Sequence, residues 1–196
     1  KDSPLYIDHL YLNNGQGNFT EGTGVIPDIR QSGSGVIAAD YDHDGDLDLF
    51  IGGRLIPGEY PMPADSYILR NDTKDKVCRF VDVTKEVAPD FLKLGLVTSA
   101  LWTDVDNDGW VDLIIVGEFM PITCYKNLNG RTFTRVGQDS FANTSGWWNS
   151  LTAGDFDNDG DTDYVATLLT WVSFLVTMSP TCNLGSTRRL FCLPRG

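Results

Sequence analysis

Basic residues are scarce in this chain. Its 196 residues include 15 Lys and Arg against 27 Asp and Glu, which gives a formal net charge of −12 at pH 7. Nucleic-acid binding needs basic side chains that neutralise phosphates, so this balance argues against a nucleic-acid partner. Long helical patterns are also missing, since Pro89 limits residues 85–93 to one or two turns. The rest of the sequence favours β-strands.

The patterns of common zinc and catalytic sites are missing too. No C-x-x-C spacing occurs among the four cysteines, Cys78, Cys124, Cys182 and Cys192. Cys78 and Cys124 fall in expected strands and are predicted to be buried free thiols. The two histidines, His9 and His43, stand alone, and no Ser/His/Asp or Cys/His set can be assembled. We therefore expect a protein without catalytic activity.

The end of the chain differs from the rest. No acidic residue follows Asp163. The apolar run at 164–178 is too short, and too interrupted by Thr and Ser, to predict a membrane span. Residues 167–196 are therefore an atypical tail. Two explanations stay open: a capping strand closed by a Cys182–Cys192 disulfide, or a change of reading frame.

The chain contains three copies of one acidic motif, D-x-D-x-D-G-x-x-D. We call the copies aspartate loops 1, 2 and 3; they span 40–48, 104–112 and 155–163 and hold fourteen of the 27 acidic residues. Carboxylates this close repel one another unless a cation lies between them. Calcium is the natural candidate, because it takes roughly six to eight oxygen ligands and tolerates irregular geometry. The sequence predicts about three Ca²⁺ ions, acting as structural staples.

The spacing within each loop suits a tight turn around a cation. Positions 1, 3 and 5 supply carboxylates, Gly at position 6 permits the bend, position 7 offers its carbonyl oxygen, and position 9 closes the cage. An EF-hand is the obvious rival, but it needs a glutamate at position 12 and flanking helices. Here position 12 is apolar in every copy: Ile51, Ile115 and Ala166. The motif therefore predicts a short metal-binding loop within a β-hairpin.

The sequence around the loops repeats as well. The copies begin at residues 40, 104 and 155, a spacing typical of repeat architectures. Apolar runs flank each copy and predict a hairpin of strands buried on both faces. A second strand–turn–strand element recurs at 10–20, 67–84 and 124–134. Together the two elements give four antiparallel strands per repeat, which is the pattern of a β-propeller blade.

This count divides the chain into about three blades of an all-β propeller, one that is incomplete. The expected units are a hairpin at 5–34, blades at 35–95 and 96–137, and an inner hairpin at 146–166. The Gly- and Pro-rich insert at 52–66 lengthens the first repeat and is predicted to be an ordered surface loop.

The aspartate loops and the run Leu-Tyr-Leu-Asn-Asn-Gly-Gln-Gly-Asn-Phe-Thr at 10–20 resemble FG-GAP/VCBS repeats, also found in integrin α-subunit propellers. The likeness covers roughly residues 5–166 of a propeller segment at 1–166, and it is nearest to the bacterial secreted and cartilage-acidic-protein-like branch. It implies calcium binding by the side chains of Asp40, Asp42, Asp44, Asp48, Asp104, Asp106, Asp108, Asp112, Asp155, Asp157, Asp159 and Asp163. It implies binding through the position-7 carbonyl of Asp46, Trp110 and Asp161.

The resemblance also bears on size and location. Propellers of this family have about seven blades, so we expect either a fragment or a chain that assembles with further blades. Calcium loops of low affinity fit millimolar extracellular calcium, which favours a secreted, periplasmic or cell-surface protein.

Adhesion, or recognition of a protein or carbohydrate, is the function that the resemblance implies. The alternative is the propeller portion of a secreted enzyme, such as a polysaccharide lyase or a phospholipase. Nothing in the sequence marks Glu59, Glu86 or Glu118 as catalytic. Four tryptophans could form a sugar-stacking platform, but packing in the core or between blades is the favoured reading: Trp102, Trp110, Trp147 and Trp148. His43, at position 4 of its loop, is expected to face solvent.

Overall fold

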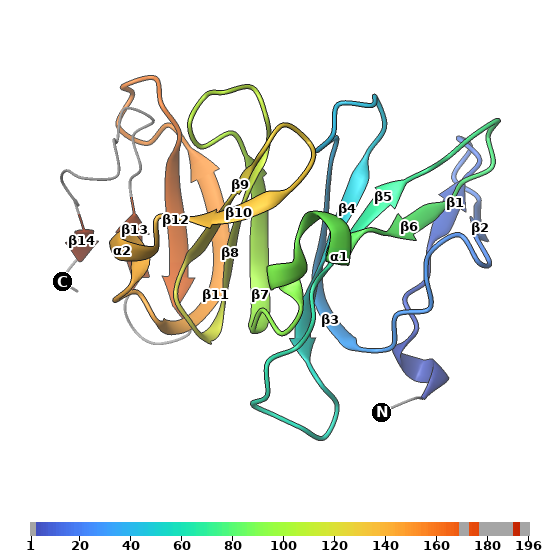
Figure 1. Ribbon diagram of the computed structural model, residues 1–196, viewed down its shortest axis with the longest axis horizontal. Helices are drawn as coiled ribbons and strands as arrows, with labels where there is room; N and C mark the ends of the chain where they lie inside the picture. Colours follow the sequence, from blue (N-terminus) through green and yellow to red (C-terminus); the bar gives the residue numbers. More distant parts are fainter. Residues whose placement is uncertain (1–2, 169–172, 177–189, 193–196) are drawn as a thin grey trace.

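The computed structural model describes residues 3–168, 173–176 and 190–192, and its strands form successive antiparallel sheets (Figure 1). The first is a hairpin of β1 (Tyr11–Asn13) and β2 (Phe19–Glu21). A four-stranded sheet follows, with its strands in chain order: β3 (Ser32–Ala39), β4 (Asp48–Leu55), β5 (Tyr67–Asn71) and β6 (Phe80–Asp82).

Two further groups of four strands repeat this order. One comprises β7 (Leu96–Thr103), β8 (Asp112–Met120), β9 (Thr123–Asn127) and β10 (Phe133–Val136). The other comprises β11 (Gly146–Gly154), β12 (Asp163–Leu168), β13 (Ser173–Val176) and β14 (Leu190–Cys192). We call the groups blades 1, 2 and 3. A short pairing of β8 with β11 joins blades 2 and 3. The prediction of antiparallel propeller blades is confirmed.

The blades stand side by side along the molecule, with the N-terminal hairpin at one end (Figure 1). The β3–β4, β7–β8 and β11–β12 connections, which are the three aspartate loops, all project from the same edge. The segment 56–66, between β4 and β5, hangs from the opposite edge. The repeat in the sequence thus becomes a row of acidic loops on one face.

Helices are short and lie between strands. Blades 1 and 2 are joined by α1 (Thr84–Val87) and the 3-10 helix η2 (Pro89–Phe91), as predicted from the interruption at Pro89. The others are η1 (Pro4–Tyr6) and α2 (Gln138–Phe141). Among the described residues, no helix has the length and apolar character needed to cross a membrane.

The core lies between neighbouring blades. Phe91, which is fully buried, meets Phe50 of β4 edge-on at 5.6 Å between ring centroids and Tyr125 of β9 at 4.7 Å. A second cluster packs Ile114 and Val116 of β8 against Trp148 and Tyr164 of blade 3. Each blade thus depends on its neighbour to bury its apolar face.

The prediction that strands beside the aspartate loops are buried on both faces holds for β8 and is wrong for β3 and β11. Every position of β8 is buried except Phe119. In β3 and β11 most residues are exposed or half-buried. The reason for β3 is its place at the edge of its sheet, where it pairs with β4 alone.

The predicted surface loop at 52–66 begins later than expected, because β4 continues to Leu55. The close approach of the returning chain explains the glycine at position 53. A Cβ on Gly53 would lie 2.0 Å from the carbonyl oxygen of Asp65, a distance that no side chain could occupy. The glycines that suggested a loop therefore permit tight packing within a strand.

The cysteine predictions have mixed outcomes. Cys124 is a buried free thiol in β9, as expected. Cys78 is also free, but it is only partly buried and lies outside any strand, because a turn at 74–77 separates β5 from β6. Cys182 lies outside the described residues, and so does its predicted pairing with Cys192. Most of the atypical tail at 167–196 also lies outside them.

Replacing Phe91 by alanine tests the shared core. We expect Phe91→Ala to lower the free energy of unfolding by about 3–5 kcal/mol, because it empties the space between two blades. Urea denaturation with calcium present would measure the loss. Val77→Ala, at a position that is 70% exposed, is the control and should change stability by less than about 0.5 kcal/mol. Equal effects of the two substitutions would contradict a core shared between blades.

Candidate metal centres

The same hydrogen bonds shape all three aspartate loops. In each, the position-1 carboxylate accepts the backbone N–H groups of positions 5 and 6. These donor–acceptor distances are 3.2 and 3.1 Å at Asp40, 3.1 and 2.8 Å at Asp104, and 3.2 and 3.1 Å at Asp155. The position-5 carboxylates, Asp44, Asp108 and Asp159, accept the N–H of position 7 at 3.1, 2.9 and 3.1 Å. The aspartates therefore fold the loop as well as charge it.

Two residues in each loop have left-handed backbone conformations. At position 6 the φ angles of Gly45, Gly109 and Gly160 are 98°, 90° and 94°, which suit glycine. At position 4 the φ angles of His43, Asn107 and Asn158 are 60°, 56° and 61°. Asparagine tolerates this region better than most side chains, so the Asn at position 4 in two copies is a sequence signal for the left-handed conformation.

The position-9 aspartate anchors each loop to its blade. Asp48 and Asp112 are fully buried, and Asp163 is nearly so. Each accepts the N–H of position 2, at 3.3, 3.0 and 2.9 Å respectively. Asp48 and Asp112 also accept an N–H from the last residue of the third strand, Asn71 at 2.8 Å and Asn127 at 2.7 Å. One carboxylate thus joins the loop to β5 or β9.

Burial makes these anchors costly to ionise. Desolvation raises the pKa of Asp48 to about 7 and that of Asp112 to about 6, although the N–H donors oppose the shift. Neighbouring aspartates of the same loop raise both pKa values further. A bound cation would offset both the burial and the repulsion. The electrostatics therefore favour a metal ion.

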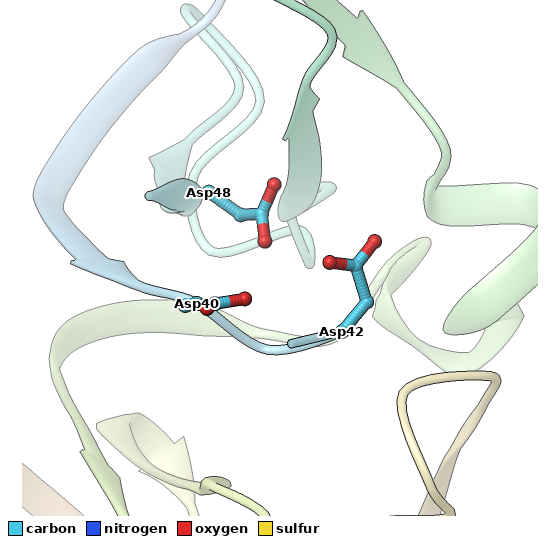
Figure 2. Close-up of side chains that lie close together, drawn as sticks. All are labelled: Asp40, Asp42 and Asp48. Carbon is cyan, nitrogen blue, oxygen red and sulfur yellow. The ribbon is translucent and has the colours of Figure 1, made fainter. Parts of the chain in front are cut away.

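Side-chain oxygens converge in every loop. Three groups have one oxygen from each member within 4.8 Å of the others: Asp40, Asp42 and Asp48; Asp104, Asp106 and Asp108; and Asp155, Asp157 and Asp163. Figure 2 shows the first group, with its three carboxylates turned toward one another. Each group could hold a metal ion.

The remaining predicted ligands have other positions. Asp44 and Asp159 lie outside these groups, as does Asp112, whose oxygens accept two backbone N–H groups. Within the described residues, Oδ1 of Asp46 is enclosed and has no hydrogen-bond partner. An enclosed carboxylate oxygen without a donor beside a carboxylate cluster fits a hard cation. Ligation by the position-7 carbonyls of Asp46, Trp110 and Asp161 stays a prediction.

Aspartate loop 2 contains a cation of its own. The ammonium of Lys126, in β9, forms an ion pair with Asp106 and lies 3.0 Å from Oδ2 of Asp108. Arg70 is the equivalent residue of β5, but it pairs with Asp72 at 2.7 Å instead of with loop 1. Loop 2 therefore differs from loop 1 in having a tethered competitor for metal.

Loops 1 and 2 contact each other across the blade boundary. The ring of His43 stacks on Trp110 with 4.0 Å between centroids and 12° between planes. His43 is exposed, as predicted, but Trp110 covers one face of its ring. The side-chain amide of Asn127 donates to the carbonyl of Tyr41 at 2.8 Å. A ring stack and a hydrogen bond thus join aspartate loop 1 to the neighbouring blade.

Family comparison gives the motif its context. The model for FG-GAP-like repeats matches residues 6–51 and 104–166, more than half of the chain. The chain belongs to the FG-GAP-like repeat family. Both matched regions end in the strand that follows an aspartate loop, β4 or β12. The FG-GAP-like unit therefore joins outer strands of one blade to the inner hairpin of the next. Comparison with curated proteins gives no significant match.

Glu118, which no sequence motif marks, is a buried carboxylate. It is 4% exposed and accepts hydrogen bonds from Arg54, Tyr60 and Trp147. Burial alone would raise its pKa, but these donors hold the pKa below its usual range. Its sequence signal is that it is the single charged residue in the apolar run at 113–122.

The tryptophans divide between packing and exposure. Trp148 is buried, and Trp102 packs against Phe133 with 5.8 Å between centroids, as expected for core and interface residues. Trp110 belongs to aspartate loop 2 and stacks on His43 of loop 1. Trp147, in contrast, is 38% exposed, beside Phe119. The four do not form one platform.

Removing the tethered cation should strengthen metal binding at loop 2. We expect Lys126→Gln to raise the calcium affinity of one site by about tenfold or more, because calcium no longer competes with an ammonium group. Isothermal titration calorimetry would resolve the change. Lys85→Gln, at an exposed position of α1, removes the same charge elsewhere and should leave the affinity nearly unchanged. A weaker site in Lys126→Gln would show that the lysine supports the loop instead of competing.

The raised pKa values predict opposite pH trends with and without metal. Unfolded aspartates titrate near pH 4, but Asp48 and Asp112 titrate near pH 7 and pH 6 in the metal-free fold. The metal-free fold therefore binds more protons than the unfolded chain, and its stability falls as pH rises between these values. Calcium needs ionised carboxylates, so its stabilising effect grows over the same interval.

Thermal unfolding with calcium or EDTA would measure both trends. The Tm difference between the two conditions should be larger at pH 7.5 than at pH 5.5. In EDTA the double variant Asp48→Asn, Asp112→Asn should lose most of the pH dependence, because amides do not titrate. A Tm in EDTA that rises from pH 5.5 to pH 7.5 would contradict the assignment.

Proposed function

We propose that this protein is a calcium-binding FG-GAP propeller segment of an exported protein, without catalytic activity, that recognises a protein or carbohydrate ligand. The observation that carries the calcium part is the recurrence of a carboxylate triad, within 4.8 Å, at the same place in each blade. One such cluster could be accidental. Three in register on one edge are a repeated metal site.

The donor chemistry supports calcium over softer metals. The clusters offer carboxylate oxygens, and carbonyl oxygens are close along the chain, which is the ligand set of a hard cation. Bound calcium would neutralise loops that contribute most of the −12 net charge. It would also fix the anchors, such as Asp48, that join each loop to its blade. Its role is therefore that of a structural staple.

Export follows from the same chemistry. Short acidic loops that exchange metal with solvent fill readily at millimolar calcium, the extracellular level, and poorly at cytosolic levels. The protein would then reach its folded, stapled state outside the cell, where an adhesion or recognition module acts.

Exposed apolar residues at both ends of the row support contact with further blades. Position 2 of loop 1, Tyr41, is 1% exposed because it packs on Phe133 of the next blade, at 5.6 Å between centroids. Phe156 has the same position in loop 3 and is 51% exposed. At the other end, Tyr11 and Phe19 of the first hairpin are 58% and 64% exposed. Additional blades would cover these surfaces and protect the unpaired edges.

Calcium titration tests the proposal. Calorimetry should find three ions per chain, one for each triad. Saturating calcium should stabilise the fold, by about 2.7 kcal/mol for each site at a free concentration one hundred times its Kd. A large downward shift of Tm in EDTA would report the same effect.

Single substitutions assign the sites. Asp42→Asn, Asp106→Asn and Asp157→Asn, each at position 3 of a loop, should each remove one ion from the stoichiometry. Asp75→Asn is the matched control, because Asp75 lies in the β5–β6 turn, outside the loops. A chain that binds no calcium, or whose Tm is indifferent to EDTA, would overturn the proposal.

A further inference from the structure

Three exposed aromatic rings meet on the edge of the blades opposite the aspartate loops. Tyr60 follows β4, Phe119 lies near the end of β8, and Trp147 lies near the start of β11, so three blades contribute. The rings are 51%, 59% and 38% exposed. Phe119 is central: its centroid lies 6.3 Å from that of Tyr60 and 5.3 Å from that of Trp147. We call these three residues the aromatic face.

Glu118 holds the aromatic face from below. Its Oε2 accepts the Tyr60 hydroxyl at 3.1 Å, and its Oε1 accepts the Trp147 indole N–H and pairs with Arg54. The polar tips of two rings are thus turned onto a buried carboxylate, while ring surface remains exposed to solvent. A ligand would meet rings already fixed in place, which lowers the entropy cost of binding.

The backbone at Phe119 is strained in the same place. Its φ is +58°, in the left-handed region that phenylalanine rarely occupies. Non-glycine residues persist in this region where the surroundings over-determine them, often at ligand sites. Here the strain presents a large apolar side chain to water, although every other residue of β8 is buried. Core packing therefore does not account for this residue.

The charges of Arg54 and Glu118 limit the chemical class of ligand that the aromatic face can bind. Arg54 neutralises Glu118, so the site offers no free carboxylate to a cationic ligand and places a guanidinium where such a ligand would lie. Exposed ring surface over an ion pair without net charge matches a neutral sugar, whose C–H face stacks on aromatic rings.

We propose that the aromatic face binds a neutral glycan chain, with a pyranose stacked on Phe119 and its neighbours contacting Tyr60 and Trp147. Glu118 acts as a positioning residue for Tyr60 and Trp147, and Arg54 neutralises its charge. The inference rests on the recognition role proposed above and specifies its ligand class and its site. The glycan would lie on the face away from calcium, so the metal would act on binding only through the fold.

Affinity electrophoresis of the full chain, with calcium present, tests this site. The probes are the neutral polysaccharides β-glucan, xyloglucan and galactomannan, with pectin and alginate as acidic comparisons and an immobilised peptide array as a protein comparison. We expect retardation by at least one neutral polysaccharide. Phe119→Gly removes the central ring at a backbone angle that suits glycine, so it should weaken binding by about tenfold or more without lowering Tm.

Further variants distinguish binding at the aromatic face from non-specific binding by other exposed apolar residues. Trp147→Ala should weaken binding as Phe119→Gly does, whereas Phe19→Ser, at an equally exposed phenylalanine on β2, should not. Glu118→Gln keeps the shape but loses the ion pair with Arg54. It should weaken binding and shift the tryptophan fluorescence of the free protein, because Trp147 loses its fixed partner.

Three results would overturn the inference: no retardation by any neutral polysaccharide, equal binding by Phe119→Gly and the unchanged protein, or binding to acidic glycans or peptides alone. Calcium titration remains an independent readout of the proposed function. Normal calcium binding with failure of the glycan arm would overturn this inference alone. Loss of both would overturn the recognition module as well.

Discussion

The buried carboxylate at position 9 of each aspartate loop is the interaction on which the blades depend. Asp48 and Asp112 each accept one N–H from their own loop and another from the end of the third strand, so a single side chain joins three strands. The same carboxylates are desolvated among like charges, which makes them costly to ionise without a cation. The fold of each loop and the convergence of its carboxylates are thus two results of one arrangement.

Packing between blades extends this dependence along the row. Tyr41 belongs to aspartate loop 1 but is buried by blade 2, and its carbonyl accepts the side chain of Asn127. The stack of His43 on Trp110 adds a contact between the two metal loops themselves. The opposite face has a different character, because aromatic rings over a neutralised carboxylate replace acidic loops there. The two edges therefore differ in chemistry: converging carboxylates lie on one and exposed aromatic rings on the other.

The motif spacing predicted much of the candidate site, because a D-x-D-x-D-G-x-x-D loop dictates its own local hydrogen bonds. The positions of Asp40, Asp104 and Asp155 and the bend at each glycine needed no knowledge of the fold. Features set by distant contacts were missed. Gly53 was read as a loop residue, yet the approach of Asp65 makes it a packing requirement. The exposure of β3 followed from its place at a sheet edge, and Lys126, which pairs with loop 2, belongs to β9.

The sequence by itself determined the repeat, the antiparallel hairpins and the three acidic loops, since each motif copy and the strands beside it are neighbours along the chain. The tertiary structure decided which of those carboxylates converge: Asp48 and Asp163 join their clusters, whereas in loop 2 the third member is Asp108, which lies beside Lys126 of β9. It alone placed Glu118 beneath Tyr60 and Trp147, residues that lie 58 and 29 positions away along the chain. Local spacing encodes the metal loops, whereas a surface built from three blades exists only once those blades pack together.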